Sequence, residues 1–258
     1  MSRPDIHTAQ TLEDPITIPY ETVVNAMTQG TVDDELGLMR WGSNYTFLGS
    51  VTHTPDNTSF LAIYKPKMGE RPLWDFPDGT LYKREVASYH VSEALGWSIV
   101  PPTIVHDGPR GVGSLQTFIE HDPERHYFTF EACHAEQLRR IAAFDAITNN
   151  ADRKGGHCLL DVDGHIWGID HGLTFHPMNK LRTVIWDFAG TPMQQDIMDD
   201  LTKLCAQLDD TTSDLSVQMQ ALLSAQEIQA MKRRVDRLLQ RACYPEPGPG
   251  PNRPWPAV

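Results

Sequence analysis

Hydrophobic and polar positions alternate in the first part of the chain as they do in half-buried β-strands. Residues 41–53 and 59–66 follow this pattern, and the turn-forming residues 54–57 lie between them. The two segments therefore predict antiparallel strands joined by a tight turn. Residues 99–120 contain two further short hydrophobic runs around a glycine-rich turn. This part of the chain predicts a small antiparallel sheet.

One helix is expected between these two pairs of strands. Over residues 83–97 the larger hydrophobic side chains recur at helical spacing and fall on one face, and Gly96 is typical of a helix end. The residues on this face are Val86, Tyr89, His90, Ala94 and Trp97.

The pattern becomes mostly helical after residue 122. Residues 134–150 predict a helix that is buried, because its hydrophobic residues occupy more than one face. Residues 159–170 predict two short strands around a Val-Asp-Gly turn. The chain from Asp187 onward is again helical, and Ser224 and Glu227 form the sequence signature of a capping box before the last helix.

These elements predict an α+β protein with two lobes, a small antiparallel β lobe with one helix and a larger, mostly helical lobe. The predicted divisions are an N-terminal extension at 1–39, the small lobe at 40–122, the large lobe at 123–243 and a tail at 244–258. The tail is dense in proline and glycine, which predicts disorder.

The composition narrows the function classes. The net charge of −12 argues against non-specific binding to DNA or RNA, which depends on neutralising phosphates. No run of 18 apolar residues predicts a transmembrane helix, and the first residues do not resemble a secretory signal. The four cysteines have no paired spacing. We expect a cytoplasmic protein that is not an integral membrane protein and binds no nucleic acid.

Four residues are candidates for phosphate and metal chemistry. Lys65 ends an apolar strand, where an ammonium grips phosphate oxygens, and Glu85 lies near the start of the following helix, where it can pair with that lysine. Asp152 follows the buried helix, and Asp170 ends a short strand. Loop carboxylates serve as bases and as Mg²⁺ ligands. Taken singly, each also fits a solvated surface position, a helix cap or a turn.

The histidines at 157, 165, 171 and 176 raise the alternative of a zinc site. Their spacing places no pair on one helical face, and an HExxH motif is absent. The segment DVDGH resembles the start of a calcium loop but lacks the glutamate that completes one. Neither alternative is favoured.

Lys65, Glu85 and the segments "NADRKGGH" and "GIDHG", in this order and spacing, resemble the kinase core of the phosphatidylinositol 3- and 4-kinase-like superfamily. Its relatives include the HipA-type protein kinases and the secretory-pathway kinases. The segment "EVASYHVSEALGWSIVPPT" is similar to a helix and strand of the phosphatidylinositol 4-kinases. Over roughly residues 40–240 the chain also resembles an actinobacterial kinase-like family. The resemblance implies a bilobal protein-kinase-like fold.

The resemblance also implies roles for individual residues. Lys65 would contact the α- and β-phosphates of ATP and Glu85 would orient it, while Asp152 would be the catalytic-loop aspartate and Asp170 the main Mg²⁺ ligand. Residues near the adenine would be Gln116, Thr117 and Phe118. The turn over the phosphates would be formed by Gly42, Ser43 and Asn44, although this segment is not a GxGxxG loop. Residues that meet the substrate would be Lys180 and Arg182.

Two positions depart from the family pattern. Lys154 stands where the family has histidine, and His157 stands where an asparagine oxygen holds the second metal. An imidazole nitrogen is a poorer Mg²⁺ ligand than an oxygen. His157 as a metal ligand would therefore favour Mn²⁺, or would instead donate a hydrogen bond to a phosphate.

The expected function is an ATP- and Mg²⁺- or Mn²⁺-dependent phosphotransferase. Its partners would be the nucleotide and an acceptor that is a protein, a lipid headgroup or a small molecule. Two alternatives use the same residues. One is a nucleotide-binding pseudokinase that serves as an interaction module, and the other is a nucleotidyl (AMP) transferase.

Overall fold

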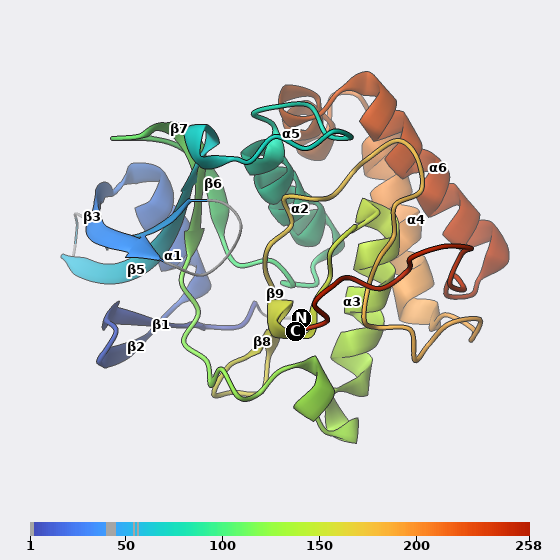
Figure 1. Cartoon of the computed structure of the whole chain (residues 1–258), viewed down its shortest axis with the longest axis horizontal. Coiled ribbons are helices and arrows are strands. Elements are labelled where there is room, and N and C mark those ends of the chain that lie inside the picture. The colour runs from blue at the N-terminus through green and yellow to red at the C-terminus, as the bar shows by residue number, and fades with distance from the viewer. Residues whose placement is uncertain (1–2, 40–44, 54, 56) are drawn as a thin grey trace.

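A five-stranded antiparallel sheet forms the smaller lobe of the computed structural model, which describes residues 3–39, 45–53, 55 and 57–258 (Figure 1). The strand order is β3-β4-β5-β7-β6. The bounds of the strands are β3 Thr31–Met39, β4 Thr46–His53, β5 Thr58–Pro66, β6 Thr103–Gly108 and β7 Gly111–Thr117. The predicted strand pairs correspond to β4–β5 and β6–β7. Between β5 and β7, Lys65 lies opposite Ser114 and Ile63 opposite Gln116.

Two helices flank this sheet. Helix α1 (Tyr20–Gln29) packs against β4, and α2 (Leu81–Leu95) packs against β6 and β7. Helix α2 is the helix predicted between the strands, and it ends at Gly96, whose left-handed backbone (φ 66°) has little cost for glycine.

The N-terminal residues are part of the small lobe, which differs from the extension predicted at 1–39. Strand β3 is an edge strand of the sheet, and β1 (Ile6–Thr11) and β2 (Asp14–Ile18) form a hairpin packed against β5. The His7 carbonyl accepts a hydrogen bond from the Glu120 N–H (2.9 Å), and His7 Nε2 lies 2.7 Å from Asp163 Oδ2 in the large lobe. The hairpin therefore contacts both lobes at their junction.

The larger lobe is mostly helical, as predicted, so the α+β fold with two lobes is confirmed. Its helices are α3 Ala135–Thr148, α4 Gln195–Asp209, α5 Asp214–Leu222 and α6 Ala225–Arg241. A short hairpin, β8 (Cys158–Leu160) and β9 (Ile166–Gly168), lies beside α3 (Figure 1). The capping box predicted at the start of α6 is present, with Ser224 and Glu227 bonded reciprocally. No helix in the described residues has the length and apolarity needed to cross a membrane.

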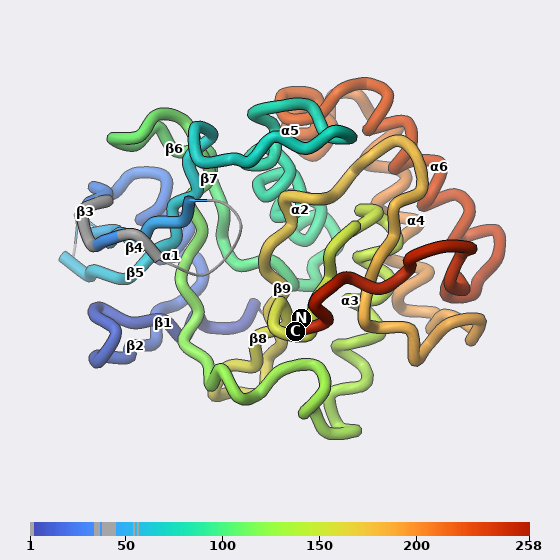
Figure 2. Tube along the Cα trace, in the orientation of Figure 1, coloured from blue at the N-terminus to red at the C-terminus, as the bar shows by residue number. Residues whose placement is uncertain are grey.

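The proline-rich segment 244–258 lies along the large lobe, which differs from the predicted disorder. It crosses in front of α3 and ends beside the β8–β9 hairpin (Figures 1 and 2). Tyr244 is buried, and the carbonyls of Tyr244, Asn252 and Ala257 each accept a backbone hydrogen bond. Proline removes a backbone donor but keeps the acceptor, and it holds the chain extended without internal hydrogen bonds. The same composition therefore suits a segment that binds an existing surface through its carbonyls.

Candidate active site

Lys65 points from β5 into the junction of the two lobes and makes two ion pairs. Its Nζ lies 2.7 Å from Glu85 Oε1 and 3.1 Å from Asp170 Oδ1. Burial alone would lower the pKa of the Lys65 ammonium, but Asp170 and Glu85 outweigh it and raise the pKa above its ordinary value. Lys65 is therefore a fixed positive charge that joins a strand, a helix and a loop.

Glu85 is buried on α2 and uses both carboxylate oxygens. Oε1 binds Lys65, and Oε2 accepts the backbone N–H of His171 at 2.8 Å. His171 directly follows Asp170, so Glu85 fixes the loop that carries this aspartate as well as the lysine that faces it. One carboxylate thus sets the positions of both charged partners.

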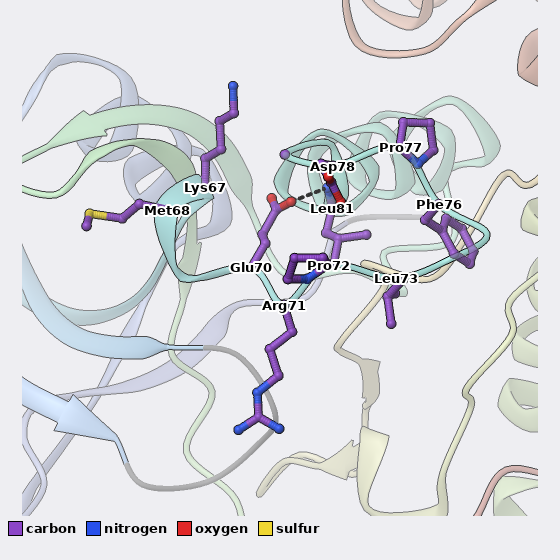
Figure 3. Close-up of a pocket in the computed structure, with 11 residues that line it drawn as sticks. Lys67, Met68, Glu70, Arg71, Pro72, Leu73, Phe76, Pro77, Asp78 and Leu81 are labelled. Carbon is purple, nitrogen blue, oxygen red and sulfur yellow. Dashed lines mark hydrogen bonds between the residues drawn. The ribbon is translucent and has the colours of Figure 1, made fainter.

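The loop before α2 supplies a residue that the sequence did not indicate. The Glu70 carboxylate accepts the backbone N–H groups of Leu81 (3.1 Å) and Tyr82 (2.8 Å), which begin the helix. Thr80, the residue at the N-cap position, makes no side-chain cap bond. Figure 3 shows Glu70 directed at the start of α2 and Arg71 directed away from it. Glu70 replaces the missing cap and stabilises the helix that carries Glu85.

Asp170 has a left-handed backbone (φ 59°), which is uncommon outside glycine and is found at functional sites. Its neighbours are fixed on both sides, because the Ile169 carbonyl accepts a hydrogen bond from Arg153 (3.0 Å) and the His171 N–H is held by Glu85. The Lys65 ammonium keeps the pKa of the Asp170 carboxyl well below its usual range. Asp170 is ionised and about half exposed, as a metal-binding carboxylate must be.

Asp152 lies in the loop after α3. Its N–H donates to Asn150 Oδ1 (2.9 Å), and its Oδ2 lies 2.9 Å from Lys154 Nζ. Burial raises the pKa of Asp152, and the Lys154 ammonium offsets part of that increase. A carboxylate with a raised pKa is a better proton acceptor, which suits a base at this position.

A fully buried ion pair supports this loop. The Arg153 guanidinium binds the Asp145 carboxylate of α3 (3.0 Å), and it also donates to the His157 carbonyl (3.2 Å). With its bond to Ile169, Arg153 connects α3, the Asp152 loop and the Asp170 loop. Burial of a charge requires such complete pairing. The sequence contained the arginine next to Asp152, but nothing in it indicated the partner Asp145.

His157 lies beside Asp170, with Nε2 3.4 Å from Oδ2. Burial lowers the pKa of His157 to about 4, so the ring is neutral near pH 7. The Lys154 N–H points to Nδ1 at 3.4 Å. The structure therefore brings His157 to the predicted metal position as a neutral imidazole.

A cavity of about 320 Å³ lies at the centre of these residues and is lined by Lys65, Glu85, Asp152 and Asp170. Within the described part of the chain, no three His, Cys, Asp or Glu side chains are grouped to hold a metal by themselves. Mg²⁺ characteristically uses one or two protein carboxylates and takes its other ligands from phosphates and water. The donor set therefore fits a divalent ion that binds together with a nucleotide.

The segment predicted to lie near the adenine is the end of β7, with Gln116 and Thr117 in the strand and Phe118 directly after it. Gln116 Nε2 donates to Thr103 (2.8 Å), and the N–H groups of Thr117 and Phe118 donate to the carbonyls of Pro102 and Leu61. These side chains and N–H groups do not line the cavity at Lys65. The residues predicted to cover the phosphates, Gly42, Ser43 and Asn44, lie outside the described residues.

The two predicted substrate residues differ in their surroundings. Lys180 Nζ is paired with Asp75 Oδ2 (2.9 Å) and lies over the ring of Trp74, so its charge is already balanced by the loop before α2. Arg182 is partly exposed, and its backbone pairs with the Asp152 loop. Neither residue lines the cavity at Lys65.

The chain is similar to several known proteins. The Mycobacterium tuberculosis protein Rv2133c is 40% identical over 257 residues, which cover 86% of this chain and 91% of that protein. Phosphatidylinositol 4-kinase gamma 4 of Arabidopsis thaliana is 28% identical over 162 residues, covering 46% of this chain and 28% of that protein. Among solved structures, the Helicobacter pylori proinflammatory kinase CtkA matches with a TM-score of 0.46 and 13% identity, over 83% of this chain and 96% of that one.

The family assignment comes from a model that spans most of the chain. The model of phosphatidylinositol 3- and 4-kinases matches residues 33–225, which include most of both lobes and every residue that lines the cavity at Lys65. The chain belongs to the phosphatidylinositol 3- and 4-kinase family.

Proposed function

We propose that this kinase transfers the γ-phosphoryl group of ATP, with a divalent metal ion, to an acceptor hydroxyl that meets Asp152. Membership of the family makes the protein a phosphotransferase. The observation that carries the finer proposal is the position of Lys65 Nζ, 2.7 Å from Glu85 and 3.1 Å from Asp170, in a cavity that Asp152 also lines.

The lysine is the phosphate-binding group in this proposal. Lys65 is held from two sides, so it can bind α- and β-phosphate oxygens without losing further side-chain freedom. Phosphoryl transfer depends mainly on positioning and on electrostatic stabilisation of the transferring group. Glu85 contributes by keeping the ammonium in place.

Asp170, with His157 beside it, would hold the metal ion next to the phosphates. When bound, the ion neutralises charge on the phosphate oxygens. The contact of Asp170 with Lys65 holds this carboxylate ionised before any ligand binds.

Asp152 is the proposed proton acceptor for the incoming hydroxyl. Burial raises its pKa and so increases its basicity, while the Lys154 ammonium offsets part of that increase. The bonds of the Asp152 N–H to Asn150 and of the Arg153 N–H to the Arg182 carbonyl hold the backbone of this loop, and Asp152 lines the cavity.

A thermal-shift titration tests this proposal. ATP and ADP are added with and without Mg²⁺ or Mn²⁺ to the wild type, to Asp170→Asn and to the control Asp107→Asn, which alters an exposed aspartate of β6. A ligand at 100 times its Kd stabilises the folded state by about 2.7 kcal/mol. We expect a metal-dependent rise in Tm in the wild type and in the control, and its loss in Asp170→Asn.

Transfer is then followed with γ-labelled ATP, measuring label on the protein itself, on added protein or lipid, and in free phosphate. A wild type that shows no metal-dependent nucleotide shift contradicts the proposal. Nucleotide binding without transfer to any acceptor, water included, would support the pseudokinase alternative instead.

A further inference from the structure

Residues 252–257 are bound to the same loop that carries Asp152. The Gly155 N–H donates to the Ala257 carbonyl at 2.7 Å, three residues beyond Asp152. At the other end, the Asn252 carbonyl accepts hydrogen bonds from the Thr183 N–H (3.1 Å) and from Trp186 Nε1 (3.0 Å). The segment therefore spans from residues 183–186 to the catalytic loop.

Residues 252–257 lie on a strip of backbone that residues 182–184 form with the catalytic loop. The Arg153 N–H donates to the Arg182 carbonyl (3.0 Å), and the Val184 N–H donates to the Arg153 carbonyl (3.1 Å). Thr183 lies between these two bonds and directs its own N–H to Asn252. Residues 182–184 thus lie parallel to the catalytic loop, and residues 252–257 add to their outer side.

Glycine at 155 permits the close approach at the other end of the strip. A Cβ at this position would lie 2.8 Å from the Phe128 ring and 3.4 Å from the Ala257 oxygen. Within the segment, Pro254 is buried, whereas Trp255 is 92% exposed. The contact therefore depends on backbone bonds and on Pro254, and the large side chain of Trp255 takes no part in it.

The strip offers hydrogen-bond donors, and the segment offers acceptors. The donors are the N–H groups of Gly155 and Thr183 and the indole of Trp186. A proline-rich peptide matches them, because it is extended in advance and presents carbonyls with few donors that need partners. A segment of the same chain also has a high effective concentration at this surface.

We propose that this strip, formed by Gly155, Thr183 and Trp186, is the acceptor-side docking surface of the kinase, and that residues 252–257 occupy it as an intramolecular inhibitor. This inference rests on the proposed function, since it takes Asp152 as the group that meets the acceptor. Lys65, Glu85 and Asp170 line the nucleotide side of the cavity. An acceptor that docks on the strip next to Asp152 would therefore displace the segment.

The test releases the segment in the full-length chain. Pro254→Asp places a charge at the buried contact, and Trp255→Ala is the matched control because that side chain is exposed. Hydrogen exchange at the Gly155 and Thr183 amides measures release. Turnover is measured as phosphate release and self-labelling from γ-labelled MgATP. We expect faster exchange and about a fivefold rise in turnover in Pro254→Asp, the ratio that corresponds to loss of one hydrogen bond, and no change in Trp255→Ala.

A second variant covers the case in which Pro254→Asp is unstable. Trp186→Phe keeps an aromatic ring and removes only the indole donor to Asn252. The synthetic peptide NRPWPAV, added to either released variant, should restore low turnover without changing the nucleotide-induced rise in Tm. Faster exchange at Gly155 with unchanged or lower turnover would overturn the proposal. A wild type and variants that all fail to bind MgATP would instead refute the proposed function.

Discussion

Lys154 Nζ lies 2.9 Å from Asp152 Oδ2, so the proposed base carries its own counter-charge two residues away. Both side chains are about three-quarters buried. Burial raises the pKa of the Asp152 carboxyl, and the ammonium lowers it part of the way back. Burial and the Lys154 ammonium therefore shift the pKa of Asp152 in opposite directions, and Lys154 limits how far burial raises it.

Replacing this lysine should move the acid limb of the pH–rate profile. In Lys154→Met the burial effect remains and the ammonium is lost, so the pKa of Asp152 rises further. Because only the deprotonated carboxylate accepts a proton, activity should fall at a higher pH than in the wild type. Measuring kcat/KM for γ-phosphoryl release against pH checks this, with Lys154→Arg as the control that keeps the charge. An unshifted limb in Lys154→Met would show that Asp152 is not the titrating base.

His157 should determine the choice of metal ion without acting as a pH switch. Its pKa of about 4 leaves the ring neutral between about pH 6 and 8, so the metal preference should be constant across that range. His157→Asn replaces a nitrogen with the oxygen that Mg²⁺ prefers. We expect the ratio of Mg²⁺ to Mn²⁺ affinity in the presence of ADP to rise by about tenfold. Electron paramagnetic resonance of bound Mn²⁺, with Mg²⁺ as competitor, measures that ratio. An unchanged ratio would show that His157 does not bind the metal.

Glu70, which also lines the cavity at Lys65, should affect nucleotide binding through the cap that it gives α2. Glu70→Ala removes the acceptor for the Leu81 and Tyr82 N–H groups, which should lower the free energy of unfolding by about 1 kcal/mol. Because α2 carries Glu85, the nucleotide-induced rise in Tm should also decrease. Glu70→Gln keeps an acceptor and should lose less of both. Equal losses in the two variants would mean that the charge of Glu70, and not the cap, is what matters.

The sequence predicted the elements whose signals are local. Strands β4 and β5 alternate enough to be recognised, Gly96 ends α2, and Ser224 with Glu227 marks the start of α6. Strand β3 lacks such a signal, because it is an edge strand with three consecutive acidic residues, 33–35, and among the described strands it pairs with β4 only. The segment 244–258 was missed for a similar reason. Its order depends on donors at Gly155 and Thr183, which are far away in the sequence.

In the candidate site, too, some residues could be predicted from the sequence and others could not. The resemblance of the segments around Lys65, Glu85, Asp152 and Asp170 to a kinase core predicted that they meet, and the structure places them around one cavity. The groups that hold them in place were not predictable. Asp145 and Glu70 act through contacts with Arg153 and with the start of α2 that only the folded chain brings together, and no motif in the sequence marks either residue.

A buried ion pair between Arg84 and Glu227 joins α2 of the small lobe to α6 of the large lobe. Arg84 also donates to the Thr174 carbonyl (2.6 Å), and Glu227 accepts the Ser224 N–H (2.8 Å), so each charge has a second partner. Removing one member of a buried pair costs about 3 to 5 kcal/mol, whereas replacing both with apolar residues costs much less. Glu227→Met should therefore be far less stable than the wild type in urea denaturation, and Arg84→Met with Glu227→Met should recover most of the loss.

The stability that Glu227→Met loses should depend on pH in a definite direction. Burial alone would raise the pKa of the Glu227 carboxyl, but Arg84 and Ser224 outweigh it and hold the pKa below its ordinary value. A lowered pKa in the folded state stabilises it at pH values above the unfolded pKa, and this contribution disappears as pH falls through the folded pKa. The stability difference between wild type and Glu227→Met should therefore be largest near neutral pH and should decrease under acidic conditions. Since Arg84 directly precedes Glu85, the same variant should also reduce the nucleotide-induced rise in Tm. A stability difference that does not change with pH would show that Glu227 stabilises the protein by packing rather than by its charge.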